Sequence, residues 1–494
     1  MRGEKYLLSW RLAVAARGVE MTTAMKPAGL STKNVVSLLI AAAIVALSYA
    51  LPAASGLSNE GQTVLGILFA GIILWITEAL PLPATALLVL ILMPLLGVCS
   101  FNDAYAKSIG STAYFLMGTF AFTVALDATS IPTRMVAFVL KHAGTDSKKV
   151  LLGFMLACAL LSTVMSDVAA CGVFISVGKR LLELNNAEKG KSRLGKAIMI
   201  AIPWASYAGG AASMAGNGVN VLTVNFFDEL FGVQITFVQW MMLGIPTAII
   251  LLITSWIVVC VCFKPEAVSQ ESVDMTFEEV GKLGKLSSPE IRTIVIITLA
   301  MVCWILSSWI PVLNTAMVAI AAMVLFAVPG SSTLKFDELL KRMNWGVILM
   351  IMCIMSVSSF VVSTGAGEWI VNTVVAAVPV EVRTPLVLLA VVSIIGAITH
   401  NVVPVGPAVA GILAFPLGTI AQQFGISMTT MLMTVAWMSS FSYMLPLDCV
   451  PILTYTTGYY KMSDMVKTGI VPTLVSIVLA VALLPLLCIV FGLS

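Results

Sequence analysis

The sequence predicts an all-α polytopic membrane protein with about 11 transmembrane helices, two re-entrant helical hairpins and two inverted-topology repeats. Of its 494 residues, 59% are hydrophobic and 10% are charged, whereas about 25% are charged in a soluble domain. Apolar runs of about 20 residues, the length that spans a bilayer as a helix, recur along the chain. Two stretches rich in small residues, polar residues, Gly and Pro interrupt these runs, and the second resembles the first.

A basic segment, residues 1–34, precedes the first long apolar run. We predict that it is a cytoplasmic N-terminal tail and that residues 35–60 form the first transmembrane helix and its loop. A cleaved signal peptide that ends near the small residues of 50–53 is the alternative. The tail is favoured because the charged region is long and more apolar runs follow it.

Lys and Arg cluster in four later connections, at 141–149, 179–196, 335–342 and 461–467. Short cytoplasmic loops are enriched in these residues, so the four connections and the N-terminus are expected on the cytoplasmic side of the cell (inner) membrane. One longer hydrophilic segment, 264–292, carries both signs of charge and is predicted to be a cytoplasmic linker.

The linker separates two halves, 61–263 and 293–494, in which short motifs recur in the same order at a nearly constant offset. The matched positions are Pro81 with Pro311, Asp167 with Asn401, Gly209 with Ser440, and Gly244 with Gly469. If each half has about five full crossings and one hairpin, the odd number of crossings inverts the second copy relative to the first.

A re-entrant hairpin is predicted in each half, near 150–180 and near 385–424. In the first half, polar residues at 162–167 lie in the middle of an apolar segment of about 30 residues, too long for one straight span and too short for two. A single kinked helix is the alternative. Irregular backbone at membrane depth is tolerated where it lines a cavity or is buried in protein, and a duplicated pair of such breaks indicates a transport site.

The chain resembles the divalent anion/sodium symporter family, whose members carry dicarboxylates, citrate and sulfate. The resemblance runs from about residue 60 onward along the matched motifs. It is carried by Thr-Glu-Ala-Leu-Pro-Leu-Pro-Ala-Thr-Ala-Leu-Leu at 77–88, Gly-Gly-Ala-Ala-Ser-Met-Ala-Gly-Asn-Gly-Val-Asn at 209–220, Gly-Ile-Pro at 244–246, Met-Leu-Pro at 444–446 and Gly-Tyr-Tyr-Lys-Met-Ser-Asp-Met at 458–465. It implies an eleven-helix fold with two hairpins, a homodimer, and an elevator motion of the transport domain.

The family's signature is a Ser-Asn-Thr triplet at each hairpin tip, which contacts substrate carboxylates and adjacent sodium sites. This chain departs from it: the first tip reads Ser166-Asp167-Val168. The second tip reads either His400-Asn401-Val402, from the repeat offset, or Gly406-Pro407-Ala408, counted back from Pro416.

The candidate site lies where the hairpins and the polar breaks meet. No Lys or Arg occurs in 152–178, 201–227, 393–417 or 429–460, so an anion would be held by hydroxyls, amides, His400 and helix N-termini. The candidate substrate-binding residues are Ser166, Asp167, Val168, Asn217, His400 and Asn401. The candidate cation-binding residues are Ser162, Ser166, Asp167, Gly209, Ser213, Asn217 and Asp448.

Asp167 and Asp448 place negative charge in the region where an anion would bind, and burying an unpaired carboxylate is costly. A bound cation, a proton, or pairing with His400 would relieve the repulsion. Each Asp is alternatively a helix cap only, and His400 is alternatively a structural histidine.

These features predict a secondary active transporter of small di- or tricarboxylate-type anions that works by an elevator mechanism and is coupled to Na⁺ or H⁺ or exchanges anions. The alternatives are a proton-linked carrier of a different small solute and an anion exchanger without Na⁺ coupling. We expect no enzymatic activity, no nucleic-acid partner and no cofactor beyond Na⁺ as coupling ion. The nine Cys include no C-x-x-C pair that would suggest a metal site. The expected partners are the anion, the lipid bilayer and a second copy of the chain.

Overall fold

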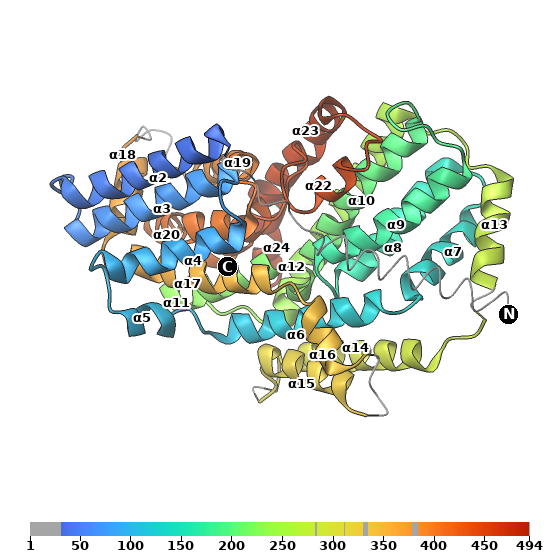
Figure 1. Ribbon diagram of the computed structural model, residues 1–494, viewed down its shortest axis with the longest axis horizontal. Helices are drawn as coiled ribbons and strands as arrows, with labels where there is room; N and C mark the ends of the chain where they lie inside the picture. Colours follow the sequence, from blue (N-terminus) through green and yellow to red (C-terminus); the bar gives the residue numbers. More distant parts are fainter. Residues whose placement is uncertain (1–30, 282–283, 311, 330–333, 378–383, 494) are drawn as a thin grey trace.

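The structure is a computed structural model that describes residues 31–281, 284–310, 312–329, 334–377 and 384–493. Nearly all of the predicted N-terminal tail lies outside these residues. The described part is helical and contains no strand (Figure 1).

The first transmembrane helix and the helices of the first half begin and end as follows: α2 Thr32–Ala50, α3 Asn59–Thr77, α4 Leu82–Leu95, α5 Phe101–Ala106, α6 Ser111–Asp127, α7 Ile131–Ala143, α8 Ser147–Ser162, α9 Asp167–Leu184, α10 Arg193–Ala212, α11 Gly218–Phe231 and α12 Phe237–Phe263. Those of the linker and the second half are α13 Gln270–Gly281, α14 Ser288–Leu306, α15 Thr315–Ala327, α16 Phe336–Arg342, α17 Trp345–Ser363, α18 Ala366–Ala377, α19 Pro385–Val402, α20 Gly406–Phe424, α21 Met428–Met438, α22 Pro451–Tyr455, α23 Met462–Val478 and α24 Leu484–Val490.

In the described residues, 8 helices are long and apolar enough to cross a membrane, or up to 9 if α6 and α7, which are bent by 65° from each other, form one span. Three shorter apolar helices, α4, α15 and α21, add to these. A helix forms its backbone hydrogen bonds within itself, and lipid offers no partners for backbone groups. This architecture therefore suits a bilayer. The predicted all-α polytopic membrane fold is confirmed.

Short turns join two pairs of helices at the positions where hairpins were predicted. Thr163 to Ser166 connect α8 to α9, and Val403 to Val405 connect α19 to α20. The two polar breaks are also irregular: one 3₁₀ turn separates α10 from α11, and residues 439–450 separate α21 from α22. Each half therefore presents one helix pair and one broken helix.

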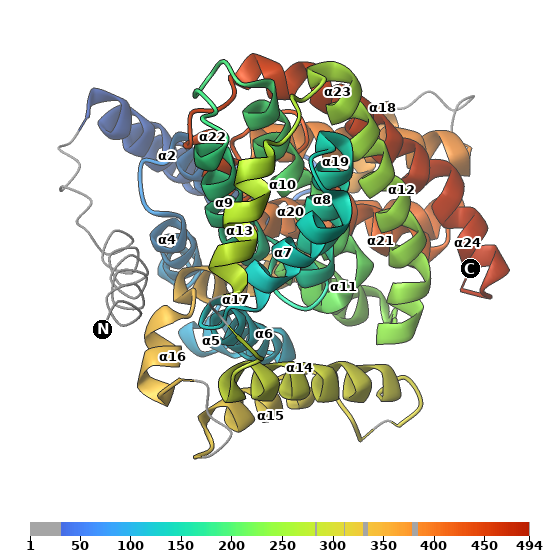
Figure 2. The same cartoon turned by 90° about the vertical axis from the view of Figure 1, so that its right-hand side faces the viewer.

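The two halves interleave instead of forming separate lobes. Helices α3 and α4 of the first half lie beside α17 of the second half (Figure 1), and α3 also packs on α18. Helix α4 packs on α17, α6 packs on α15, and α11 packs on α20. Figure 2 shows α14 and α15 as a layer at the bottom of the view, below the helices that pack around α10 and α20. This packing does not test the division of the chain into two repeats, 61–263 and 293–494, which stays a prediction.

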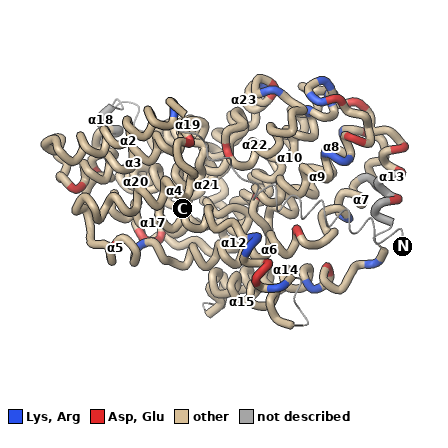
Figure 3. Tube along the Cα trace, in the orientation of Figure 1, with Lys and Arg blue, Asp and Glu red and all other residues tan. Residues whose placement is uncertain are grey.

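Charged residues lie mainly at the ends of helices and in connections, and most of the trace is uncharged (Figure 3). The predicted linker, 264–292, contains α13 and the start of α14. There Glu290 is buried and pairs with Arg134 of α7, with Nε and Oε1 2.8 Å apart. The linker is thereby attached to the first half at this point.

Candidate functional site

The first polar break positions Asn217 beside the turn between α8 and α9. Asn217 caps α11, because its Oδ1 accepts a hydrogen bond from the Val219 amide at 2.9 Å. Its Nδ2 donates to Oδ2 of Asp167 at 2.8 Å. The break and the α8–α9 turn therefore meet through one amide and one carboxylate.

Asp167 begins α9 and is 4% exposed. Its Oδ1 accepts from the Val168 amide at 2.8 Å, and the Ser166 hydroxyl lies 3.5 Å from the same oxygen. The described residues provide no Lys, Arg or His partner for this carboxylate. Asp167 is thus a buried acid with hydrogen-bond donors but no compensating positive charge.

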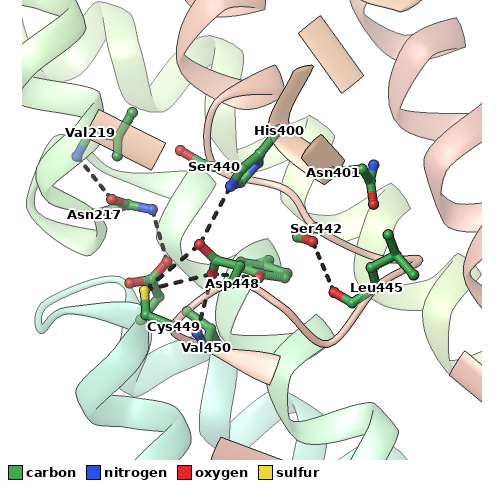
Figure 4. Close-up of polar contacts among 12 residues, drawn as sticks. Asn217, Val219, His400, Asn401, Ser440, Ser442, Leu445, Asp448, Cys449 and Val450 are labelled. Carbon is green, nitrogen blue, oxygen red and sulfur yellow. Dashed lines mark hydrogen bonds and ion pairs between the residues drawn. The ribbon is translucent and has the colours of Figure 1, made fainter. Parts of the chain in front are cut away.

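The second polar break positions Asp448, which is also 4% exposed. Its Oδ2 accepts from the Tyr207 hydroxyl at 2.9 Å and from the Val450 amide at 3.1 Å. Its Oδ1 lies 3.4 Å from Nε2 of His400 (Figure 4). This second acid differs from Asp167 because it has an imidazole beside it.

His400 lies in the last turn of α19 and is 1% exposed. Nε2 faces Asp448, whereas Nδ1 is buried and has no hydrogen-bond partner among the described residues. A buried polar atom without a partner is uncommon and calls for an explanation.

The two acids belong to one centre. Asp167 and Asp448 lie close enough to interact electrostatically. The thiol of Cys171 on α9 lies 3.5 Å from the carbonyl oxygen of Val450, which joins the α8–α9 pair to the second break. The first and second halves therefore each contribute one buried carboxylate to the same region.

The repeat alignment of Asp167 with Asn401 is wrong. Asp167 follows its turn and begins α9, whereas Asn401 precedes its turn and lies near the end of α19. The residue that begins the second helix of the other pair is Gly406. Asn401 donates from Nδ2 to the Ala397 carbonyl of its own helix, and Figure 4 shows it apart from Asp448. Nothing in these contacts brings Asn401 to the two acids.

Three other candidate cation residues hold the backbone together. The Ser162 hydroxyl donates to the Ser206 carbonyl at 2.7 Å, and the Ser213 hydroxyl donates to the Thr163 carbonyl at 2.5 Å. A Cβ on Gly209 would lie 2.1 Å from the Ala159 carbonyl oxygen, so glycine allows α10 to approach α8. These residues fix the turn against the first break.

Tyr207 and Cys449 were not among the predicted site residues. Tyr207 is 1% exposed and, as described above, donates to Asp448. Its position two residues before Gly209-Gly210 was the available signal, but a tyrosine in an apolar helix is ordinarily core. Cys449 is exposed, and its Sγ lies 3.6 Å from Oδ2 of Asp448. The residue next to the second acid therefore has an exposed side chain in the described chain.

No group of three or more His, Cys, Asp and Glu side chains that could hold a metal ion occurs in the described ranges. The polar atoms that remain for a monovalent cation are carboxylate, hydroxyl, amide and backbone carbonyl oxygens. Among them is the buried Oδ1 of Asn220, which has no partner in the described part and whose Nδ2 donates to the carbonyls of Gly210 and Ser213.

Comparisons with known proteins agree with this architecture. The sequence is similar to the sodium-dependent dicarboxylate transporter SdcS of Staphylococcus saprophyticus, with 26% identity over 475 residues that cover 91% of this chain and 90% of that protein. The SdcS of Staphylococcus aureus is 25% identical over 448 residues, 85% of each chain. In fold, the chain is similar to the Alcanivorax borkumensis YdaH transporter, with a TM-score of 0.50 and 14% identity over 94% of this chain and 99% of that one.

A family model decides the assignment. The model of the sodium:sulfate symporter transmembrane region matches residues 32–492, nearly the whole described chain. The resemblance found in the motifs is therefore confirmed. The chain belongs to the sodium:sulfate symporter family and is a multi-pass membrane transporter of anions, not an enzyme.

Proposed function

We propose that the chain is a secondary active transporter that moves small di- or tricarboxylate-type anions across the cell membrane and couples this movement to a cation. The observation that carries the proposal is Asp167, a buried carboxylate with no positive partner in the described residues, located where the α8–α9 turn meets the first break. The names of the staphylococcal relatives, sodium-dependent dicarboxylate transporters, support both the substrate class and Na⁺ as the cation.

The cation binds at Asp167. An ionised carboxylate in a low-dielectric interior is costly unless it is paired. A Na⁺ ion at this position would be held by oxygen ligands: the Asp167 carboxylate, the Ser166 hydroxyl and carbonyls of the irregular backbone at 213–217. Since the anion cannot enter beside an uncompensated carboxylate, cation binding precedes or accompanies anion binding. This order is the basis of coupling.

The anion binds between the two breaks. The hydrogen-bond donors for it are the backbone amides at the N-termini of α11 and α20, where no charged side chain lies. A helix N-terminus favours negative charge. Helix α11 packs on α20, so these donors belong to neighbouring elements of different halves. His400 supplies a side-chain donor.

Transport proceeds by an elevator motion in which the two hairpins and broken helices move together relative to the remaining helices. The chain functions as a homodimer with its N-terminus in the cytoplasm. Hydrogen bonds from Ser162 and Ser213 hold the first turn on the first break, which supports movement of these elements as one body.

Uptake into proteoliposomes tests the proposal. Labelled succinate, malate, citrate and sulfate are supplied in parallel with an inward Na⁺ gradient, an inward H⁺ gradient, both, or neither. We expect accumulation of at least one anion that depends on the Na⁺ gradient. If none of the four anions moves under any gradient or in counterflow, the proposal is wrong. Accumulation driven by H⁺ alone would identify a proton-coupled carrier, which the two buried acids favour as the second candidate.

A further inference from the structure

We propose that the groove between α7, α8 and α14 binds one phospholipid with an anionic headgroup. The headgroup lies against Lys149 at the start of α8, and an acyl chain lies along α8 toward Leu160. The groove shares no residue with the centre around Asp167 and Asp448. This inference goes beyond the proposed function and depends neither on the transported anion nor on the coupling ion.

The walls of the groove are apolar. Its volume is about 600 Å³, within the range of about 300–1,000 Å³ that ligand pockets have. Phe138 of α7, Leu156 and Leu160 of α8 and Ile294 of α14 line it, and these side chains are between 39% and 66% exposed. An occupant that removes them from water is itself apolar over this part.

Helices α7 and α8 form two sides of the groove as an antiparallel pair that packs along its length (Figure 2). Gly153 allows the close contact, because a Cβ there would lie 2.2 Å from Cγ1 of Val139. The end of α7 and the start of α8 are joined by a short turn, so His142 and Lys149 lie at one end of the groove. Leu160, near the end of α8, lies at the other.

Helix α7 places the groove near the membrane surface. It has 13 residues, about 20 Å at 1.5 Å per residue, and is too short to cross a hydrocarbon core of about 30 Å. It is amphipathic and bends by 65° from α6, as expected of a helix that lies in the interface. Trp256 of α12, a residue type enriched at membrane interfaces, donates from Nε1 to the Lys148 carbonyl at 3.0 Å. The start of α8 is therefore expected at the level of the lipid headgroups.

The length of the groove along α8 matches one leaflet. Between Lys149 and Leu160 the helix rises by about 16 Å at 1.5 Å per residue. One leaflet contributes about 15 Å, half of a hydrocarbon core of about 30 Å. An acyl chain that begins beside Lys149 thus ends beside Leu160.

Positive charge gathers at the Lys149 end. The connection 141–149 contains three exposed lysines, Lys141, Lys148 and Lys149, and one acid, Asp146. Oδ1 of Asp146 accepts from the backbone N–H groups of Lys148 and Lys149, and its Oδ2 lies 3.9 Å from Nζ of Lys149. One carboxylate does not balance three ammonium groups, so this end attracts an anionic headgroup.

Arg134 also lines the groove, but its guanidinium is occupied. It donates to both carboxylate oxygens of Glu290 and to the carbonyls of Gly284 and Lys285. The excess positive charge therefore stays at the Lys149 end, and this difference sets the direction of the lipid.

The same charge disfavours residues 1–30, the N-terminal segment outside the described residues, as the occupant. That segment contains five Lys and Arg and two Glu. Its excess of positive charge would be repelled by the three lysines, whereas an anionic phospholipid is attracted by them.

Native mass spectrometry of the purified full-length protein, stripped of lipid in detergent, tests this inference. The protein is titrated with phosphatidylglycerol, with phosphatidylcholine of the same acyl chains, and with glycerol 3-phosphate, which has the charge but no chains. We expect one phosphatidylglycerol to bind at least about fivefold more tightly than phosphatidylcholine, the gain from one lysine near an anionic headgroup. Glycerol 3-phosphate should not bind at the same concentrations.

Lys149→Gln should weaken phosphatidylglycerol binding about fivefold and leave phosphatidylcholine binding unchanged. The matched control is Lys191→Gln, which removes an exposed lysine of the 179–196 connection that does not line the groove. Leu156→Trp places a larger side chain in the groove and should weaken the binding of both lipids. Its control is Leu474→Trp, at an exposed leucine of α23 outside the groove. If Leu156→Trp does not fold, the comparison of Lys149→Gln with Lys191→Gln decides.

Equal binding of the two lipids to the wild-type protein, or wild-type affinity in Lys149→Gln, would overturn the inference. Wild-type affinity in a folded Leu156→Trp would do so as well, because the lipid would then lie elsewhere. Binding of glycerol 3-phosphate as tight as that of phosphatidylglycerol would identify a site for a soluble phosphate instead. Loss of a dimer mass in Leu156→Trp would identify a second copy of the chain as the occupant. None of these results bears on the transport assays that test the proposed function.

Discussion

Two buried carboxylates with different partners define the centre at the residue scale. Asp448 has an imidazole and a phenol, and Asp167 has an amide and a backbone N–H. Both acids are 4% exposed, so burial does not distinguish them. The difference in partners predicts different responses to the loss of charge.

Asp167→Asn should remove the dependence of transport on the coupling cation. The substituted amide has nearly the same shape, but its single acceptor oxygen can keep only one of the hydrogen bonds from the Asn217 amide and the Val168 N–H, and it offers no negative charge to Na⁺. We expect the Na⁺ concentration for half-maximal uptake to rise at least tenfold, measured as initial rates of succinate uptake. Asp274→Asn, at an exposed acid of α13, is the control and should behave as wild type. An unchanged Na⁺ response in Asp167→Asn would mean that Asp167 is a helix cap only.

Tyr207→Phe should destabilise the protein, whereas Tyr443→Phe should not. The Tyr207 hydroxyl donates to Asp448, and its removal leaves a buried carboxylate with one donor fewer, at a cost of about 1–3 kcal/mol. Tyr443 is equally buried, lies 5.7 Å away between ring centroids, and has no hydroxyl partner among the described residues. Thermal unfolding in detergent would show a lower Tm for the first variant only. Equal Tm values would contradict the role given to Tyr207.

Sequence alone singled out Asp167, His400 and Asp448 because charged or titratable residues are rare in apolar runs. It also offered Asp–His pairing as one way to relieve their repulsion. It could not choose the pair, since His400 and Asp448 are brought together only by the packing of α19 near the second break. Tyr207 gave no distinctive signal, because its hydroxyl becomes informative only once its partner is known.

At the element scale, the length of an apolar segment located the first helix pair and the repeat located the second near 385–424, but the register of the second pair did not follow from the repeat. The matched positions assumed equal spacing before the turn in both halves. Helices α9 and α20 in fact begin farther apart along the chain than that spacing implies. A turn can gain or lose residues without changing the pattern of the flanking helices, so periodicity could not detect the shift.

Close approach of α10 to α8 depends on Gly209. A Cβ there would lie 2.1 Å from the Ala159 carbonyl oxygen, so Gly209→Ala should separate the helices and cost about 1–3 kcal/mol through overpacking. Gly172→Ala on α9 is the matched control, because its Cβ would meet nothing within 4 Å and alanine favours a helix by about 0.5–1 kcal/mol. The Tm of thermal unfolding and the rate of succinate uptake should fall only for Gly209→Ala. Wild-type values for that variant would show that α10 can shift without consequence.

At the scale of the whole molecule, the exposed thiol of Cys449 reports on access to the centre. Five other cysteines are buried: Cys158, Cys171, Cys260, Cys353 and Cys488. In a Cys262→Ser background, which removes the other exposed thiol, a membrane-impermeant maleimide should label Cys449 from one side of the membrane. Saturating Na⁺ and succinate should change the labelling rate at least threefold, measured by mass spectrometry.

The control for this labelling is the double variant Cys262→Ser, Cys449→Ser, in which rapid labelling should disappear while transport persists. A labelling rate at Cys449 that is indifferent to Na⁺, to succinate and to both together would contradict the placement of the site beside Asp448.

The interleaving of the two halves has a consequence for biogenesis. Helix α6 packs on α15 so closely that a Cβ on Gly118 would lie 2.4 Å from the Ala319 backbone, and α4 rests on α17. When the ribosome has synthesised only the first half, the surfaces of α4 and α6 that will contact the second half face lipid or the insertion machinery. A nascent chain interrupted at the linker would therefore be a substrate for quality-control proteolysis and not a smaller carrier. Synthesised as two separate polypeptides in one cell, the halves should protect each other from degradation.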